Sequence, residues 1–343
     1  MANSADPPDA AINSDSISSS TLPNDKQQTP DELGEFALPA TQDYPVLTND
    51  LLSSPKPRRR WLPLILFFVT CLSTFIAGGT SWNGALSLGN GLEFRRAILT
   101  HWQQGLIYMG CVLAILGLHE MGHFLATIRY RIAASFPFFI PFPVSPIGTM
   151  GAVIGMAGHR ADRKQMFDIG IAGPLAGLVV AIPILWLGIR DLDMTIPASG
   201  PYELDLPWIV KAMISWQRPE LHSISRVSIS QLNPYFMAAW VGLLITGLNM
   251  MPISQLDGGH VIYALLLKRG HWVARIFLLT AIAYVVLARV GIWSVMLILV
   301  TLMGVDHPPT SNDRVPLGWF RTTLGWVSLS IPFLCFPARG LIM

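Results

Sequence analysis

The stretch His119-Glu120-Met121-Gly122-His123 lies inside an apolar run, residues 104–128, that is long enough to cross a bilayer as a helix. On a helix, residues four apart point to one side, so both imidazoles can bind a single cation. Glu120 lies roughly 100° around the helix from His119, where its carboxylate can take a proton from an activated water without being a ligand. Because ionisable side chains are costly at membrane depth, the pattern indicates a functional metal site.

A third ligand must come from another part of the chain. A catalytic zinc site takes three protein ligands and leaves the fourth position to water. Among the remaining apolar segments, residues 249–260 (NMMPISQLDGGH) offer an acid and a histidine together. We expect Asp257 to complete the set, so that His119, His123 and Asp257 hold one Zn²⁺.

The residues around Asp257 favour a bent backbone. Pro252 ends or kinks a helix, and the glycines at 258 and 259 permit unusual backbone angles, so the carboxylate of Asp257 can turn inward. Asn249 is a candidate hydrogen-bond donor to a substrate carbonyl or to the oxyanion formed on attack, or else makes only a contact between helices. His260 fits a residue behind the ligands, or an ordinary surface histidine, better than a fourth ligand, which would close the open position.

The composition places this site in a membrane protein. Of the 343 residues, 52% are hydrophobic and 13% are charged, against about 25% charged in soluble domains. The formal net charge of +2 does not favour nucleic acid as a partner. The three cysteines are far apart and none forms a CxxC pair, so they indicate neither a disulfide framework nor a thiolate metal site.

The apolar runs predict an all-α polytopic membrane protein with about six transmembrane helices. The basic cluster Arg58-Arg59-Arg60 before the first run predicts a cytoplasmic N-terminus. The expected spans are residues 61–79, 104–128, 167–187 and 234–251, two shorter segments at 276–287 and 291–303, and a last candidate at 317–336.

The segments between and before the spans differ in character. Residues 133–156 are apolar but broken by prolines and glycines, which favours a re-entrant strand or loop element inside the membrane domain. Residues 188–231 are expected to form a polar external insert with little pattern. Residues 1–55 are expected to be a disordered polar tail, either a solvated leader or an interaction tail. Residues 56–343 then form a membrane-embedded domain, which the family resemblance described next identifies as a metalloprotease domain with its core at about 105–310.

The paired motifs resemble those of the site-2 protease family of intramembrane zinc metalloproteases. The resemblance covers about residues 105–310 and includes Gly148-Thr149-Met150-Gly151 and the segment 171–177 (IAGPLAG). It implies that the two histidines and Asp257 ligate zinc, that Glu120 activates water, and that Asn249 helps to hold the substrate or its oxyanion. It also implies that residues 136–156 engage an unwound substrate segment. Residues 306–310 (DHPPT) resemble a segment of some bacterial and plastid members, and we expect a loop without chemistry there.

The resemblance implies hydrolysis of peptide bonds within or near transmembrane segments of membrane-anchored proteins. The lipid bilayer is then a partner, and the bacterial cytoplasmic membrane is the expected location. Neither a PDZ domain in the external insert nor a C-terminal CBS domain is expected, because the segments available are too short. The sequence does not indicate the oligomeric state.

Two other functions fit part of the pattern. A metal transporter or metal-sensing membrane protein would use the same three ligands, but it leaves Glu120 without a role. The other histidines lie mostly in expected loops and do not mark a transport path. An inactive scaffold ranks last, because every expected catalytic residue is present.

Overall fold

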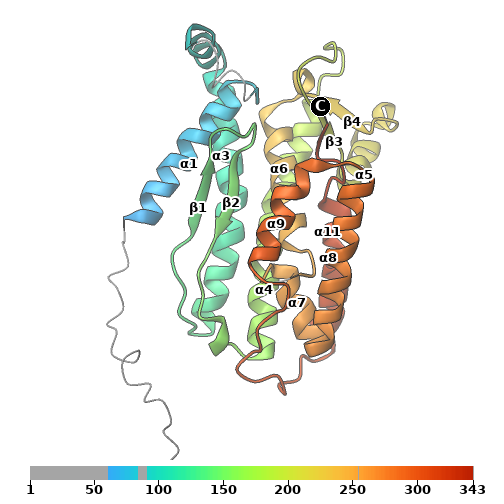
Figure 1. Ribbon diagram of the computed structural model, residues 1–343. Helices are drawn as coiled ribbons and strands as arrows, with labels where there is room; N and C mark the ends of the chain where they lie inside the picture. The colour runs from blue at the N-terminus through green and yellow to red at the C-terminus, as the bar shows by residue number, and fades with distance from the viewer. Residues whose placement is uncertain (1–60, 84–90, 254, 343) are drawn as a thin grey trace, which may run out of the picture. The chain divides into compact units, whose positions relative to one another are not determined.

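The computed structural model describes residues 61–83, 91–253 and 255–342. The expected polar tail, residues 1–55, lies outside this range. The described part is mainly helical (Figure 1). The helices are α1 (Leu62–Gly79), α3 (Gly91–Arg129), α4 (Arg163–Arg190), α5 (Trp208–Gln217), α6 (Pro234–Asn249), α7 (Asp257–Leu266), α8 (Gly270–Leu287), α9 (Ser294–Leu302), α10 (Trp319–Ser328) and α11 (Ile331–Cys335).

Four helical segments are long and apolar enough to cross a membrane. They are α1, α3, α4 and the stretch Asp257–Leu287, which contains α7 and α8. Helix α6 and the segment Gly291–Leu302 are apolar but shorter. The chain is therefore a polytopic membrane protein, while the predicted number of six spans stays a prediction.

The expected last span at residues 317–336 is wrong as a single helix. The structure divides it into α10 and α11, which are separated by Leu329 and Ser330. Pro332 lies in the first turn of α11, where its missing N–H costs least, whereas in the middle of a longer helix it would remove a backbone hydrogen bond.

The proline-rich segment between α3 and α4 forms an antiparallel strand hairpin, β1 (Phe138–Phe142) and β2 (Gly148–Val153). The hairpin packs along α1, and β2 also contacts α3 (Figure 1). The Ser73 hydroxyl donates to the carbonyl of Gly148 (2.6 Å), and the Tyr108 hydroxyl donates to the carbonyl of Ile147 (2.8 Å). A strand element is present at the expected place, and its depth in a bilayer stays a prediction.

The segment expected to be an external insert with little pattern contains regular structure. It holds β3 (Glu203–Asp205), helix α5 and β4 (Arg226–Ser228). The strand β5 (Leu341–Ile342), from the far end of the chain, pairs with β3, so the sheet order is β4-β3-β5 with antiparallel pairs. The indole N–H of Trp240 in α6 donates to the carbonyl of Asp205 (2.8 Å) and fastens this sheet to the helices.

Helix α6 forms the centre of the core. All of its residues from Phe236 to Leu244 are buried, which is typical of a helix that is apolar on every side. It packs against α3, α4 and α11. At the far end of α3, the guanidinium of Arg321 in α10 binds both carboxylate oxygens of Asp168 in α4, and the Tyr130 hydroxyl donates to the same carboxylate. This cluster joins the end of α3 to α4 and α10.

Helices α1 and α3 approach closely at small residues. A Cβ placed on Gly105 would lie 2.7 Å from the carbonyl oxygen of Phe75 and 3.1 Å from the amide nitrogen of Gly79. A Cβ on Gly110, in the same helix, would meet nothing within 4 Å. Contact between helix backbones at such residues is typical of packing in membranes.

We predict that Gly105→Ala lowers the free energy of unfolding by about 1–3 kcal/mol, because the methyl group overpacks the α1–α3 contact. Gly110→Ala is the matched control. It should leave stability unchanged or raise it by up to about 1 kcal/mol, because alanine favours the helix. Denaturant unfolding of the detergent-solubilised protein measures both variants, and equal stabilities would contradict the packing described.

Candidate metal centre

His119 and His123 lie one turn apart on the same face of α3, as the helical period predicts. Both side chains are buried, with exposed fractions of 2% and 6%. Their rings meet edge to face, with centroids 5.0 Å apart. The Nδ1–H of His123 donates to the carbonyl of Ile169 in α4 (2.8 Å), because a carbonyl can only accept. The Nε2 lone pair of a neutral His123 is therefore free to bind a metal.

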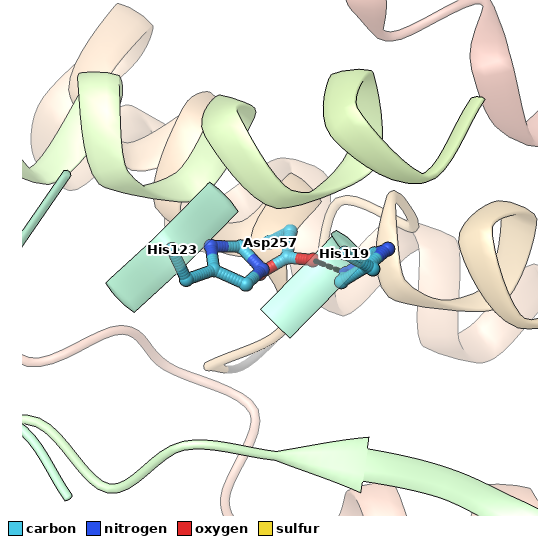
Figure 2. Close-up of side chains that lie close together, drawn as sticks. All are labelled: His119, His123 and Asp257. Carbon is cyan, nitrogen blue, oxygen red and sulfur yellow. Dashed lines mark hydrogen bonds and ion pairs between the residues drawn. The ribbon is translucent and has the colours of Figure 1, made fainter. Parts of the chain in front are cut away.

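Asp257 is the first residue of α7 and reaches the two histidines from another part of the chain. Helix α6 ends at Asn249, and the turn through Pro252 leads directly into α7. The Asp257 carboxylate lies between the two imidazoles (Figure 2), with Oδ2 3.2 Å from Nε2 of His119 and Oδ1 3.3 Å from Nε2 of His123. The break between helices thus brings together residues 138 positions apart.

The geometry of these three residues fits a zinc ion. One ligand atom from each residue lies within 4.8 Å of the other two. In a tetrahedral site with bonds of about 2.0 Å, neighbouring ligand atoms lie about 3.3 Å apart. The two nitrogen–oxygen distances, each to a different oxygen of Asp257, are close to this value. Two imidazoles and one carboxylate are also a ligand set that catalytic zinc uses. In the described part of the chain, no other such cluster of histidine, cysteine and acidic residues is found.

Three glycines of α4 pack against histidine side chains at positions where a larger residue would collide with them. A Cβ on Gly173 would overlap the imidazole of His123, and a Cβ on Gly177 would lie 3.1 Å from Nδ1 of His119. A Cβ on Gly170 would lie 2.8 Å from the Cβ of His260. The motif at 171–177 therefore lets α4 pack directly against the metal-binding side chains.

Glu120 faces a cavity of about 500 Å³ that also reaches His123 and Asp257. Its side chain is buried, with an exposed fraction of 4%. Ala152 and Val153 of β2 line the same cavity. The structure therefore places the expected acid, two of the expected ligands and the strand hairpin around one space.

Asn249 is the last residue of α6 and also lines this cavity. Its Nδ2 lies 3.4 Å from Nε2 of His119. This contact joins α6 to α3, and it is the kind of contact between helices that the sequence analysis gave as the alternative role of Asn249. Its amide also faces the space in which a substrate would lie.

His307 lines the cavity, although the sequence analysis expected no chemistry in residues 306–310. The segment around it is a loop, as expected, but its imidazole is buried and lies on the cavity wall. Its Nε2 lies 2.6 Å from Nδ1 of His260 in α7. His307 stands between Asp306 and two prolines, and this local pattern gave no signal that its side chain meets His260 in α7. His260 itself is not among the three clustered ligands.

Comparisons with known proteins agree with this site. A family model described as Peptidase family M50 matches residues 107–290. The rice protein named "Probable zinc metalloprotease EGY1, chloroplastic" is 34% identical over 155 residues, which are 44% of this chain and 26% of the rice protein. The Arabidopsis thaliana protein named "Probable zinc metalloprotease EGY2, chloroplastic" is 32% identical over 157 residues, 44% of this chain and 27% of that protein.

A third relative, a rice protein named "Probable zinc metalloprotease EGY3, chloroplastic", is 24% identical over 247 residues. The match covers 66% of this chain and 41% of that protein. The chain thus spans about a quarter of the length of the first two relatives and less than half of the third. The expected bacterial cytoplasmic membrane is not supported, because these relatives are chloroplast proteins of plants. The zinc metalloprotease names also do not favour a metal transporter.

We predict that Gly173→Ala removes zinc binding, because the new methyl group occupies the place of the His123 imidazole. Gly177→Ala should weaken zinc binding less, since its methyl group only approaches His119. Metal analysis of the purified full chain, with competition by a graded series of chelators, measures both. Equal zinc affinities for the two variants and the unchanged chain would contradict this geometry.

Proposed function

The chain belongs to peptidase family M50, and on this premise we propose that it is a zinc metalloprotease that hydrolyses peptide bonds within or near transmembrane segments of membrane-anchored proteins. One observation carries the proposal. A cluster of two buried histidines and a partly buried aspartate, with Glu120 on the same cavity, is formed by helices that are long and apolar enough to span a membrane.

Each of these side chains has a separate role in the proposed hydrolysis. When bound by His119, His123 and Asp257, zinc supplies a Lewis acid for the scissile carbonyl and lowers the pKa of water. Glu120 takes the proton of the attacking water on a carboxylate oxygen and delivers it to the leaving amide nitrogen. The Asn249 amide donates a hydrogen bond to the carbonyl oxygen as negative charge develops there. The amide lies beside His119, which supports this role.

The strand hairpin supports an extended substrate. Peptide bonds in a transmembrane helix are hydrogen-bonded within the helix, so the substrate must unwind before it is cut. In the described residues β2 pairs only with β1, and its residues Ala152 and Val153 line the cavity. A substrate segment that adds to β2 as a further strand would satisfy its own backbone groups beside Glu120.

The names of the relatives do not specify a substrate. Their names identify zinc metalloproteases of chloroplasts, and the chain matches a minor part of their length. We therefore propose the substrate class, a membrane-anchored protein, and the lipid bilayer as partner, on the position of the site among the spanning helices. The cytoplasmic side remains our proposal for the N-terminus, on the basic cluster before α1.

We predict that Glu120→Gln keeps one zinc per chain but lowers kcat by about 10²–10⁴-fold, because the amide cannot take the proton. Cleavage of a panel of single-span peptides by the detergent-purified full chain, with metal analysis, measures both properties. Glu93→Gln, an exposed position in the same helix, is the control and should change neither. A Glu120→Gln variant that cuts as fast as the unchanged chain would refute the proposed role of Glu120.

We predict that Asn249→Ala lowers kcat by about 10²–10³-fold, as the loss of an oxyanion donor does. Zinc content and unfolding should change little, since Asn249 is not a ligand and its contact with His119 is long. If unfolding becomes easier while kcat is kept, Asn249 serves only the contact between α6 and α3.

A further inference from the structure

Two histidines that the mechanism does not use meet on the wall of the catalytic cavity. His260 comes from α7, one turn after Asp257, and His307 comes from the loop before α10. Their exposed fractions are 8% and 5%, and Nδ1 of His260 lies 2.6 Å from Nε2 of His307. Both residues line the cavity that reaches Glu120 and Asp257.

The partners of His307 determine which nitrogen of each ring carries a proton. Nδ1 of His307 lies 2.5 Å from the carbonyl oxygen of Pro308, which can only accept, so this nitrogen is the N–H donor. Burial lowers the pKa of His307, which favours a neutral ring with an unprotonated Nε2. That Nε2 accepts the Nδ1–H of His260, and Nε2 of His260 is left with the lone pair.

The loop that carries His307 is fastened to α7. The ring of Tyr263 stacks on the His307 imidazole, with centroids 4.5 Å apart and planes 19° apart. The Tyr263 and Thr310 hydroxyls both donate to the carboxylate of Asp313, and Nε2–H of His271 donates to the carbonyl of His307. Partial burial acts to raise the pKa of the Asp313 carboxyl, but the hydrogen bonds to it lower the pKa by more. The carboxylate of Asp313 is therefore ionised and accepts these hydrogen bonds. His307 is thus held in one orientation.

In the part of the chain that the structure describes, the side-chain hydrogen bond of His260 is made by Nδ1, and none is made by Nε2. In this tautomer Nε2 is an acceptor, and His260 lines a cavity that receives, under the proposed function, an unwound peptide. Such a peptide brings backbone N–H groups that have lost their helical acceptors, and leaving one unpaired in a buried site is unfavourable.

We propose that Nε2 of His260 accepts a hydrogen bond from a backbone N–H of the substrate peptide, and that His307 is the positioning residue that holds the His260 imidazole in this tautomer. The inference rests on the proposed function. It makes His307, which lies in the loop before α10, part of the substrate site. It also assigns His260 to the substrate and not to the metal.

Binding of an uncut peptide tests the proposal separately from catalysis. The full zinc-loaded chain carries Glu120→Gln, and a fluorescent single-span peptide that the unchanged chain cleaves is titrated into it in detergent micelles. Adding His260→Ala should raise Kd about tenfold, as the loss of one hydrogen bond does, with one zinc per chain retained. Adding His307→Phe should do the same, since phenylalanine keeps the stacking on Tyr263 but cannot accept from Nδ1–H of His260.

Two further variants separate this role from loop packing. Asp306→Asn, next to His307, removes an exposed ion pair with Arg275 and should leave Kd unchanged. The double variant His260→Ala with His307→Phe should bind no more weakly than His260→Ala alone, because His307 acts through His260.

The outcomes that would overturn the inference differ from the outcome that would overturn the proposed function. Unchanged Kd in His260→Ala and His307→Phe, with tight binding by the Glu120→Gln chain, overturns this inference alone. Loss of zinc from His260→Ala overturns it as well, because His260 would then be a ligand. If the unchanged chain cuts no peptide of the panel and the Glu120→Gln chain binds none, the proposed function fails and the inference fails with it.

Discussion

The structure depends on placing two buried imidazoles, the buried carboxylate of Glu120 and the partly buried carboxylate of Asp257 among apolar helices. Such groups lose their hydration, and this loss is tolerated only where each has a partner or an ion. The Asp257 carboxylate lies between His119 and His123, and the Ile169 carbonyl accepts from the second of these histidines. The close approach of α4 through Gly173, and the end of α6 at Asn249, both serve to complete this cluster.

The helix break between α6 and α7 is the main device that assembles the site. A continuous helix through Pro252 would carry Asp257 past the histidines, whereas the turn lets α7 begin at Asp257 itself. A Cβ on Gly258 would overlap the carbonyl of Met250, so the turn also requires a glycine there. Because α7 restarts at this point, His260 projects from the next turn toward the same cavity, and the break supplies both a ligand and a wall residue.

The sequence predicts the parts of this site that follow from local rules. Helical periodicity is enough to pair His119 with His123, and the proline and glycine content of residues 133–156 is enough to expect an irregular element where β1 and β2 form. Asp257 follows because residues 249–260 offer an acid and a histidine together in an apolar segment. The sheet around β3 and the contact of His307 with His260 were not predictable, because each joins segments far apart in the chain through strands or loops too short to leave a pattern. The division of 317–336 depended on a single proline within an apolar run.

The pairing of β5 with β3 joins two strands that are synthesised at very different times. Residues 203–205 leave the ribosome long before residues 341–342, so β3 must wait for its second neighbour while α6 to α11 are made and inserted. During this interval β3 can pair only with β4, and its other edge is open. Contacts of such large separation form slowly, so the pairing of β3 with β5 comes late in folding.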